Sequence, residues 1–317
     1  MRRENYTERA VGGLALGVST ISGSTFNAFA KSLSMTLSSL SLLFVSELLT
    51  GLFVIMSCGI LPVVNKLFRL HKRELFWLLT MAALSGIFGP LLLFSGLGMT
   101  SAVNAGFFGK MQIIFMLLFA HFLLKEKMTK AYFIAITCIM TGIAIIMLHG
   151  FTSGLSLEFG DLLIIASTLC YALGSIVFRA KLQHIEPHIA LFVRSSVAVG
   201  IFFLASPFIQ HPFIEEIRQM PSMLFPSLFG FAFISRYLNG VTYYAALDRI
   251  PISTVSLVGS LEIVGATFFS FWYLGEPIHW YHFAGGAFVI LGNILLEALG
   301  PHQAKEILQE QLKQKTP

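Results

Sequence analysis

Apolar segments of about 20 residues, separated by short polar connections, run along almost the whole chain. An α-helix of that length crosses the hydrocarbon core of a bilayer, which is about 30 Å thick. We expect ten such helices, at residues 10–30, 40–61, 75–97, 102–124, 131–149, 161–178, 189–207, 222–246, 253–274 and 280–298. A transmembrane barrel would show alternating segments of about 10 residues instead. The pattern therefore predicts an all-α, polytopic membrane protein.

Composition and cysteine usage agree with this class. Of the 317 residues, 56% are hydrophobic and only 12% are charged, whereas about 25% of a soluble chain is charged. Cys58, Cys138 and Cys170 all lie within apolar segments, so no disulfide framework is expected. The connections are short apart from the one around residues 210–221, which leaves no room for a soluble domain.

The basic residues predict the orientation of the helices. If both termini are cytoplasmic, 16 of the 21 Lys and Arg residues fall on cytoplasmic segments, and only Lys31 and Arg218 fall outside. This distribution follows the positive-inside rule. The net charge of +5 is thus a topology signal, and no nucleic-acid partner is expected. The first segment also resembles a signal peptide, but it is long for one and has a counterpart later in the chain.

The second half of the chain repeats the first at an offset of 150 residues. Matching pairs include Leu97 with Leu247, Gly109 with Gly259, and Glu126 with Glu276. Each unit holds five helices, an odd number, so the second copy enters the membrane inverted. We expect a first repeat at residues 1–150, a second at 151–300 and a cytoplasmic tail at 301–317. An inverted repeat of this kind is typical of secondary carriers.

Two segments carry a resemblance to a known family. The fourth helix of each half runs from residues 102–105, Ala-Val-Asn-Ala, to 124–126, Leu-Lys-Glu, and from 260–263, Ser-Leu-Glu-Ile, to 274–277, Leu-Gly-Glu-Pro. Over residues 10–298 the chain resembles the drug/metabolite transporter superfamily, within it the ten-helix carriers with two EamA-type repeats. The resemblance implies a carrier in a bacterial inner membrane.

The chain departs from the pattern of that family at two places. Ile113 and Ile263 stand where the family commonly has proline, which puts a helix kink there in doubt. Glu47 stands where the second helix commonly carries an arginine, and only the second half keeps one, at Arg194. The ion pairs, and with them the substrate, are expected to differ accordingly.

Charged residues inside the expected helices are the first candidates for a binding site, because a charge in hydrocarbon is costly unless it is paired or faces water. They are Glu262, Lys110, Arg236, Glu47 and Arg194. We expect Lys110 and Arg236 to bind a carboxylate or other anion, and Glu262 to bind a cation or a coupling proton. The alternative is that these residues pair with each other and hold the two halves together. Arg194 lies near its helix start, where it can snorkel to the cytoplasmic surface.

Aromatic and small polar residues are further candidates. The aromatics expected near the site are Tyr237, Tyr244 and Trp272, with Phe107, Phe108 and Tyr243. They can stack on a planar group or surround a cation, although such residues also serve as packing or interface anchors. The first helix is unusually polar, with Ser19, Thr20, Ser22, Ser24, Thr25 and Asn27. These side chains either line a cavity or satisfy packing between helices.

No enzyme, phosphate-binding or metal-binding motif is recognisable, so neither a cofactor nor a metal is expected. We expect a secondary carrier, with S-adenosylmethionine, exchanged for S-adenosylhomocysteine, slightly favoured as substrate. Amino acids and drug-like metabolites are the alternatives in the same family. An intramembrane lipid-modifying enzyme and a passive channel are remote alternatives. The partners would be the bilayer, the solute and a proton or counter-substrate, while the transport direction and the oligomeric state stay open.

Overall fold

The computed structural model describes residues 2–68, 70–124, 130–148, 158–182, 185–208, 213–250, 255, 258–259, 261–292, 294–295 and 298. Each of the ten predicted segments contains helix within these residues, and no strand occurs among them. The first half comprises α1 (Arg2–Ser24), α2 (Phe26–Ser34), α3 (Ser39–Cys58), α5 (Lys72–Ala82), η1 (Ala83–Phe88), α6 (Gly89–Leu97), α7 (Ala102–Phe108), α8 (Met111–Leu124) and α9 (Lys130–Met147). The second half comprises α10 (Phe159–Lys181), α11 (Pro187–Ala205), α13 (Phe225–Gly230), η4 (Phe231–Leu238), α14 (Asn239–Arg249), α16 (Glu262–Leu274) and helix over 280–292. The all-α prediction is confirmed.

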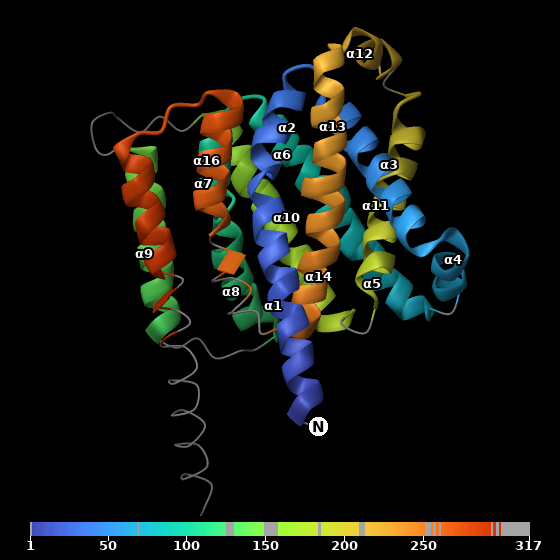
Figure 1. Ribbon diagram of the computed structural model, residues 1–317, viewed down its shortest axis with the longest axis horizontal. Coiled ribbons are helices and arrows are strands. Elements are labelled where there is room, and N and C mark those ends of the chain that lie inside the picture. The colour runs from blue at the N-terminus through green and yellow to red at the C-terminus, as the bar shows by residue number, and fades with distance from the viewer. Residues whose placement is uncertain are drawn as a thin grey trace, which may run out of the picture.

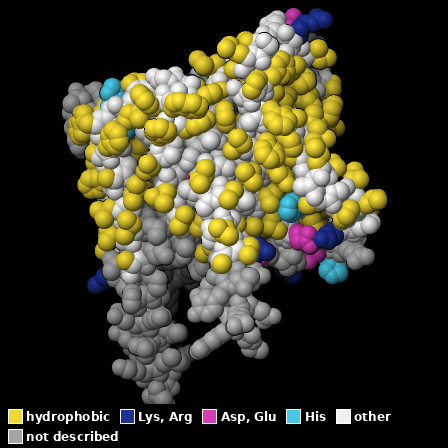
Figure 2. Space-filling view, in the orientation of Figure 1, with side chains coloured by type: hydrophobic (Ala, Val, Ile, Leu, Met, Phe, Trp, Pro, Cys, Tyr) yellow, Lys and Arg dark blue, Asp and Glu magenta, His cyan; other side chains and the backbone are white. Residues whose placement is uncertain are grey.

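The outer surface identifies a membrane protein. Within the described residues, five helices are long and apolar enough to cross a bilayer: Ser39–Cys58, Lys72–Leu97, Ala102–Leu123, Phe159–Lys181 and Pro187–Ala205. Figure 2 shows a surface covered by hydrophobic side chains, with the charged ones gathered towards its ends. Exposed apolar area of this extent is unfavourable in water and normal against lipid.

The helices of the two halves interleave rather than forming two separate bundles. α1 packs against α14, α6 against α10, and α3 against α11. The offset of 150 residues maps α1 onto α10 and α6 onto α14. The contact of α1 with α14 and the contact of α10 with α6 are therefore equivalent under the repeat. Figure 1 shows α1, α10 and α14 at the centre, while α9 and the last helix lie together at one edge. This arrangement is the one that a duplicated five-helix unit predicts.

Two short helices lie where the sequence analysis expected only connections. They are α4 (Ile60–Phe68) and α12 (Phe213–Gln219), at opposite ends of the molecule in Figure 1. Lys66 of α4 pairs with Glu186, directly before α11. Glu216 of α12 accepts hydrogen bonds from the backbone N–H and hydroxyl of Ser38, directly before α3. Each half therefore uses a surface helix to hold the start of the second long helix in the other half.

The third long helix of each half contains a π-helical segment, η1 or η4. The offset of 150 places residues 83–88 on 233–238, within η4. A π-helical turn is rare, and it often occurs beside a functional site.

The fourth long helix of the first half is broken rather than continuous, which corrects the prediction of one helix over 102–124. α7 ends at Phe108, a turn holds Gly109 and Lys110, and α8 begins at Met111. In the second half α16 begins at Glu262, directly after a turn at Leu261. The two breaks lie next to the paired glycines Gly109 and Gly259. Ile113 and Ile263, which stand where the family commonly has proline, follow four residues after these glycines. Broken membrane helices commonly form the binding sites of carriers.

Candidate functional site

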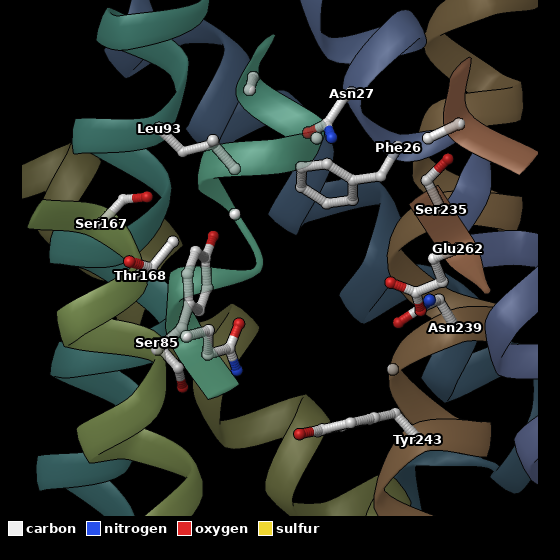
Figure 3. Close-up of a pocket in the computed structure, with 18 of the residues that line it drawn as sticks. Phe26, Asn27, Ser85, Leu93, Ser167, Thr168, Ser235, Asn239, Tyr243 and Glu262 are labelled. Atoms are coloured by element: carbon white, nitrogen blue, oxygen red, sulfur yellow. The ribbon is translucent and has the colours of Figure 1, made fainter. Parts of the chain in front are cut away.

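A cavity of about 250 Å³ lies between the two halves, at the level of the π-helical segments and the broken helices. In Figure 3 the hydroxyls of Ser85, Ser167 and Thr168 belong to one wall, formed by η1 and α10. The opposite wall, formed by η4, α14 and α16, carries Ser235, Asn239, Tyr243 and Glu262. The cavity thus has one neutral, hydroxyl-rich wall and one wall with a carboxylate.

Lys110 and Glu262 both line the cavity and form an ion pair, with 2.9 Å between Nζ and Oε2. Lys110 Nζ also donates to the carbonyl oxygen of Gly259 at 2.9 Å. The Gly259 carbonyl lies just before the turn that precedes α16. The Lys110 ammonium therefore donates both to the Glu262 carboxylate and to a backbone oxygen near the start of that helix. The side chains keep 14% and 28% exposure. The pairing that the sequence analysis weighed as an alternative is present, and the expected binding roles stay predictions.

The position of Glu262 depends on close packing by a glycine of α1. A Cβ atom added to Gly23 would lie 2.5 Å from Oε1 of Glu262 and 2.6 Å from Nδ2 of Asn239. Asn239 in turn donates to the carbonyl oxygen of Ser19 at 3.0 Å. α1 therefore presses directly against the wall that carries the carboxylate.

A second charged network lies behind the cavity wall. Glu47 on α3 is fully buried, and its carboxylate pairs with Arg236 of η4. Nε of Arg194 on α11 lies 3.5 Å from Oε1 of the same carboxylate, and the Ser195 hydroxyl donates to Oε2 at 2.7 Å. Both arginines line the cavity, whereas Glu47 does not.

The expectation that Arg194 snorkels to the cytoplasmic surface is wrong. The residue is only 9% exposed and turns towards Glu47. Gly86 of η1 makes room for it, since a Cβ there would lie 2.5 Å from Cγ of Arg194. Gly86 and Arg236 occupy equivalent positions in the two halves. The second half carries the Arg236 side chain at this position, whereas the first half has a glycine, which leaves space for Arg194.

The predicted aromatics separate into two groups. Tyr244 and Tyr243 line the cavity. Tyr237 stacks on Phe233, with 5.8 Å between ring centroids, and does not line the cavity. Trp272 is 71% exposed on the outer surface, so its expected place near the site is wrong. Lipid and a binding cavity both accept aromatic rings, and sequence position alone does not distinguish them.

Phe107 and Phe108 are buried core residues, each 2% exposed. The ring of Phe107 stacks on His282, with 5.9 Å between centroids. Neither side chain lines the cavity, so their expected place at the site is wrong as well.

The polar first helix mostly serves packing. The hydroxyls of Thr20, Ser22 and Ser24 donate to carbonyl oxygens one turn earlier in α1. Asn27 lines the cavity (Figure 3), and Thr25 bonds Ser235 at 2.7 Å. Of the two interpretations given for this helix, satisfied packing holds for most of the residues.

Several cavity residues on α10 were not predicted from the sequence. Ser167, Tyr171 and Ser175 follow one another at intervals of four residues and all line the cavity. Residues spaced by four share one face of a helix. A polar stripe in an otherwise apolar segment was the signal that would have found them.

Polar contacts hold α2, α6, α7 and the residues after α16 together at one end of the molecule (top of Figure 1). Glu276 accepts hydrogen bonds from the backbone N–H groups of Ala102 at 2.9 Å and Val103 at 3.0 Å, and so caps α7. Lys31 donates to the carbonyl oxygens of Leu97 at 2.6 Å and Thr100 at 2.5 Å. Glu126, the counterpart of Glu276, lies outside the described residues.

The cavity continues towards the opposite end of the molecule. A second cavity of about 90 Å³ shares Lys110 and Glu262 with the first and extends to Leu16, Met116 and Leu247. The ion pair thus lies between the two cavities. In the part of the chain that the structure describes, no group of three His, Cys, Asp or Glu side chains has the geometry of a metal site.

Comparison with known proteins agrees with this architecture. The chain is 24% identical to an uncharacterized transporter of Methanothermobacter thermautotrophicus over 231 residues, which cover 72% of this chain and 66% of the relative. It is 27% identical to the uncharacterized transporter YetK of Bacillus subtilis, over 70% of this chain and 68% of the relative. The chain thus spans about two thirds of the length of these relatives.

A solved crystal structure shares the fold, with a TM-score of 0.63, 15% sequence identity, and coverage of 93% of this chain and 99% of the other. The profile of the EamA-like transporter family matches twice, at residues 11–148 and 158–297. The two matches correspond to the two halves whose helices interleave around the cavity. The chain therefore belongs to the EamA-like transporter family.

Proposed function

We propose that the protein is a secondary active carrier that moves a small amphoteric metabolite by alternating access. The observation that carries this proposal is a charged cavity between two interleaved halves. At one end of the molecule, Glu276 of the second half caps α7 of the first. Tilting one half against the other would open that end and close the opposite one. The halves would correspond to residues 1–150 and 151–300.

The chemistry of the cavity favours a solute with both charges. Glu262 offers a partly exposed carboxylate for a cation, and Arg194 brings a guanidinium to the wall for an anion. Phe26, Tyr171 and Tyr243 supply aromatic surface. A solute that competes for the Lys110–Glu262 pair would couple its own binding to the contacts between the halves.

S-adenosylmethionine is the first candidate, because it combines a carboxylate, cationic groups and a flat ring. S-adenosylhomocysteine would then be the counter-substrate of an exchange. An amino acid shares the first two features and is the second candidate, followed by drug-like cations. A coupling proton on Glu262 would serve the amino-acid case.

The basic residues support an orientation with both termini in the cytoplasm of a bacterial inner membrane. The end at which Glu276 caps α7 then faces outwards, and the second cavity faces the cytoplasm.

The test is uptake of labelled S-adenosylmethionine into proteoliposomes, empty or preloaded with S-adenosylhomocysteine or unlabelled amino acids. Saturable uptake that preloading stimulates, and that Glu262→Gln abolishes, would support the exchanger. Glu186→Gln is the matched control, because it removes a carboxylate from an exposed pair far from the cavity. Uptake of amino acids without any response to the nucleoside compounds would move the second candidate to first place.

A further inference from the structure

The charges around the cavity do not balance. Lys110 and Glu262 neutralise each other. Glu47, a single carboxylate, faces two guanidinium groups, those of Arg194 and Arg236. Among the described residues that line the cavity or pair with its lining, one positive charge is therefore left over.

An uncompensated charge in the interior of a membrane protein is costly, because the low dielectric does not replace its hydration. Such residues persist where they face a water-filled cavity or bind an ion of opposite charge. The surplus charge here borders a cavity, where an anion that enters can compensate it.

Arg194, rather than Arg236, holds the surplus charge. Arg236 is the nearer partner of Glu47, its side chain is 3% exposed, and the rings of Phe26, Phe94 and Phe231 surround its guanidinium at 5.8–6.0 Å. The Nε atoms of both arginines lack a hydrogen-bond partner in the described structure. Nε of Arg194, however, lies 3.5 Å from the Glu47 carboxylate, and the Arg194 side chain is 11% exposed. Its side chain borders the cavity.

A second unpaired donor lies beside Arg194. The hydroxyl of Tyr171 is buried and also lacks a hydrogen-bond partner among the described residues. Tyr171 packs against Gly89, and Arg194 packs against Gly86, three residues earlier in the same long helix. Buried hydroxyls are nearly always paired. The ring packs against Gly89, where a Cβ atom would lie 3.1 Å from two ring carbons. The backbone of α6 therefore holds this tyrosine in place at the cavity wall.

We propose that Arg194 and Tyr171 form an anion subsite that receives the carboxylate of the transported solute. The assignment rests on the proposed function and divides its cavity into two ends. Glu262 and Lys110 form the end that exchanges a cation, and Arg194 with Tyr171 forms the end that accepts an anion. A guanidinium and a phenol hydroxyl together supply the charged and neutral donors that a carboxylate binds. This proposal differs from the sequence-based expectation, in which Lys110 and Arg236 bind the anion.

The variants that test the subsite are expected to fold. Arg194→Gln leaves Glu47 and Arg236 as a balanced pair. Tyr171→Phe removes one oxygen that bonds nothing in the described structure. Ser270→Ala is the matched control, because this buried hydroxyl also lacks a partner among the described residues but does not line the cavity.

The first measurement is the thermal unfolding midpoint of the purified, full-length protein, titrated with sodium propionate and with the neutral isostere propionamide at constant ionic strength. We expect propionate, and not propionamide, to raise the midpoint of the wild type and of Ser270→Ala. The response should vanish in Arg194→Gln. In Tyr171→Phe the apparent affinity should fall by about tenfold or more, as for one lost hydrogen bond to a charged group.

Equal responses to propionate in the wild type, Arg194→Gln and Tyr171→Phe would overturn the subsite, as would equal responses of the wild type to propionate and propionamide. Transport of the amphoteric panel by liposomes would separate this failure from that of the proposed function. Propionate binding that depends on Arg194, without transport of any solute in the panel, would refute the carrier assignment and leave the subsite standing. Transport of a solute in the panel without propionate binding would refute the subsite and leave the carrier assignment standing.

Discussion

Two ion-pair networks join the halves of this protein, and they differ in their access to water. Glu47 of the first half is fully buried and meets Arg194 and Arg236 of the second, whose side chains are 11% and 3% exposed. Lys110 of the first half meets Glu262 of the second in the cavity, where the carboxylate keeps 28% exposure. A pair that water reaches can exchange its partner for a solute ion. A sealed pair is held by the surrounding helices and changes only when those helices move.

A third pair marks the other extreme of this comparison. Lys66 and Glu186 are 47% and 56% exposed at the end of the molecule. The exposure of the charged side chains therefore increases from the buried Glu47 network, through the cavity-facing pair of Lys110 and Glu262, to the solvent-exposed pair of Lys66 and Glu186. Four substitutions test the series through the free energy of unfolding in detergent, from the largest expected effect to the smallest.

Glu47→Gln should have the largest effect. It leaves two buried guanidinium groups without a carboxylate, and breaking a buried pair in this way costs about 3–5 kcal/mol. Denaturant unfolding of the purified protein would measure the loss. Adding Arg236→Gln in the same chain should recover part of it, since fewer positive charges then remain. A single variant as stable as the wild type would contradict the sealed character of this network.

Gly86→Ala should come second, with a loss of about 2 kcal/mol, typical of overpacking a filled interior. The new methyl would lie 2.5 Å from Cγ of Arg194 and 3.2 Å from its carbonyl oxygen. Gly13→Ala is the control, because nothing lies within 4 Å of a Cβ at that position. The same unfolding measurement applies. If both alanine variants behave alike, η1 does not fix the position of Arg194.

Glu262→Gln should cost about 1.5 kcal/mol in stability, the size of one hydrogen bond to a charged group. Lys110 keeps its bond to the Gly259 carbonyl and partial access to water. Transport should nevertheless be lost, which the proteoliposome assay would show. A stability loss equal to that of Glu47→Gln would mean that the two networks do not differ in the way their exposure indicates.

Lys66→Ala should have the smallest effect, since pairs at such exposed sites contribute about 0.2–1 kcal/mol. Raising the salt concentration should reduce even this difference, because ions screen solvated charges. Unfolding at low and high salt would measure it. A large, salt-independent loss would show that α4 does more than contact the start of α11.

The sequence predicted the class of fold and the duplication well, because hydrophobic length and an offset of 150 residues are properties of the chain itself. It also identified the charged residues between the halves. It did not predict which of them pair, since Glu47, Arg194 and Arg236 meet only when three distant helices pack together. It missed α4 and α12, which are too short to show a membrane-spanning period.

The π-helical segments separate what the two halves share from what distinguishes them. Well under 1% of residues in proteins adopt this winding, and here it occurs at equivalent places in both copies of the duplicated unit. Of the six aligned positions, 83–88 and 233–238, only the serine at 85 and 235 is the same. The two copies therefore share the wide turn although five of the six aligned side chains differ. The backbone shape of the cavity wall is common to both halves, whereas its charge at this position, Arg236, belongs to the second half alone.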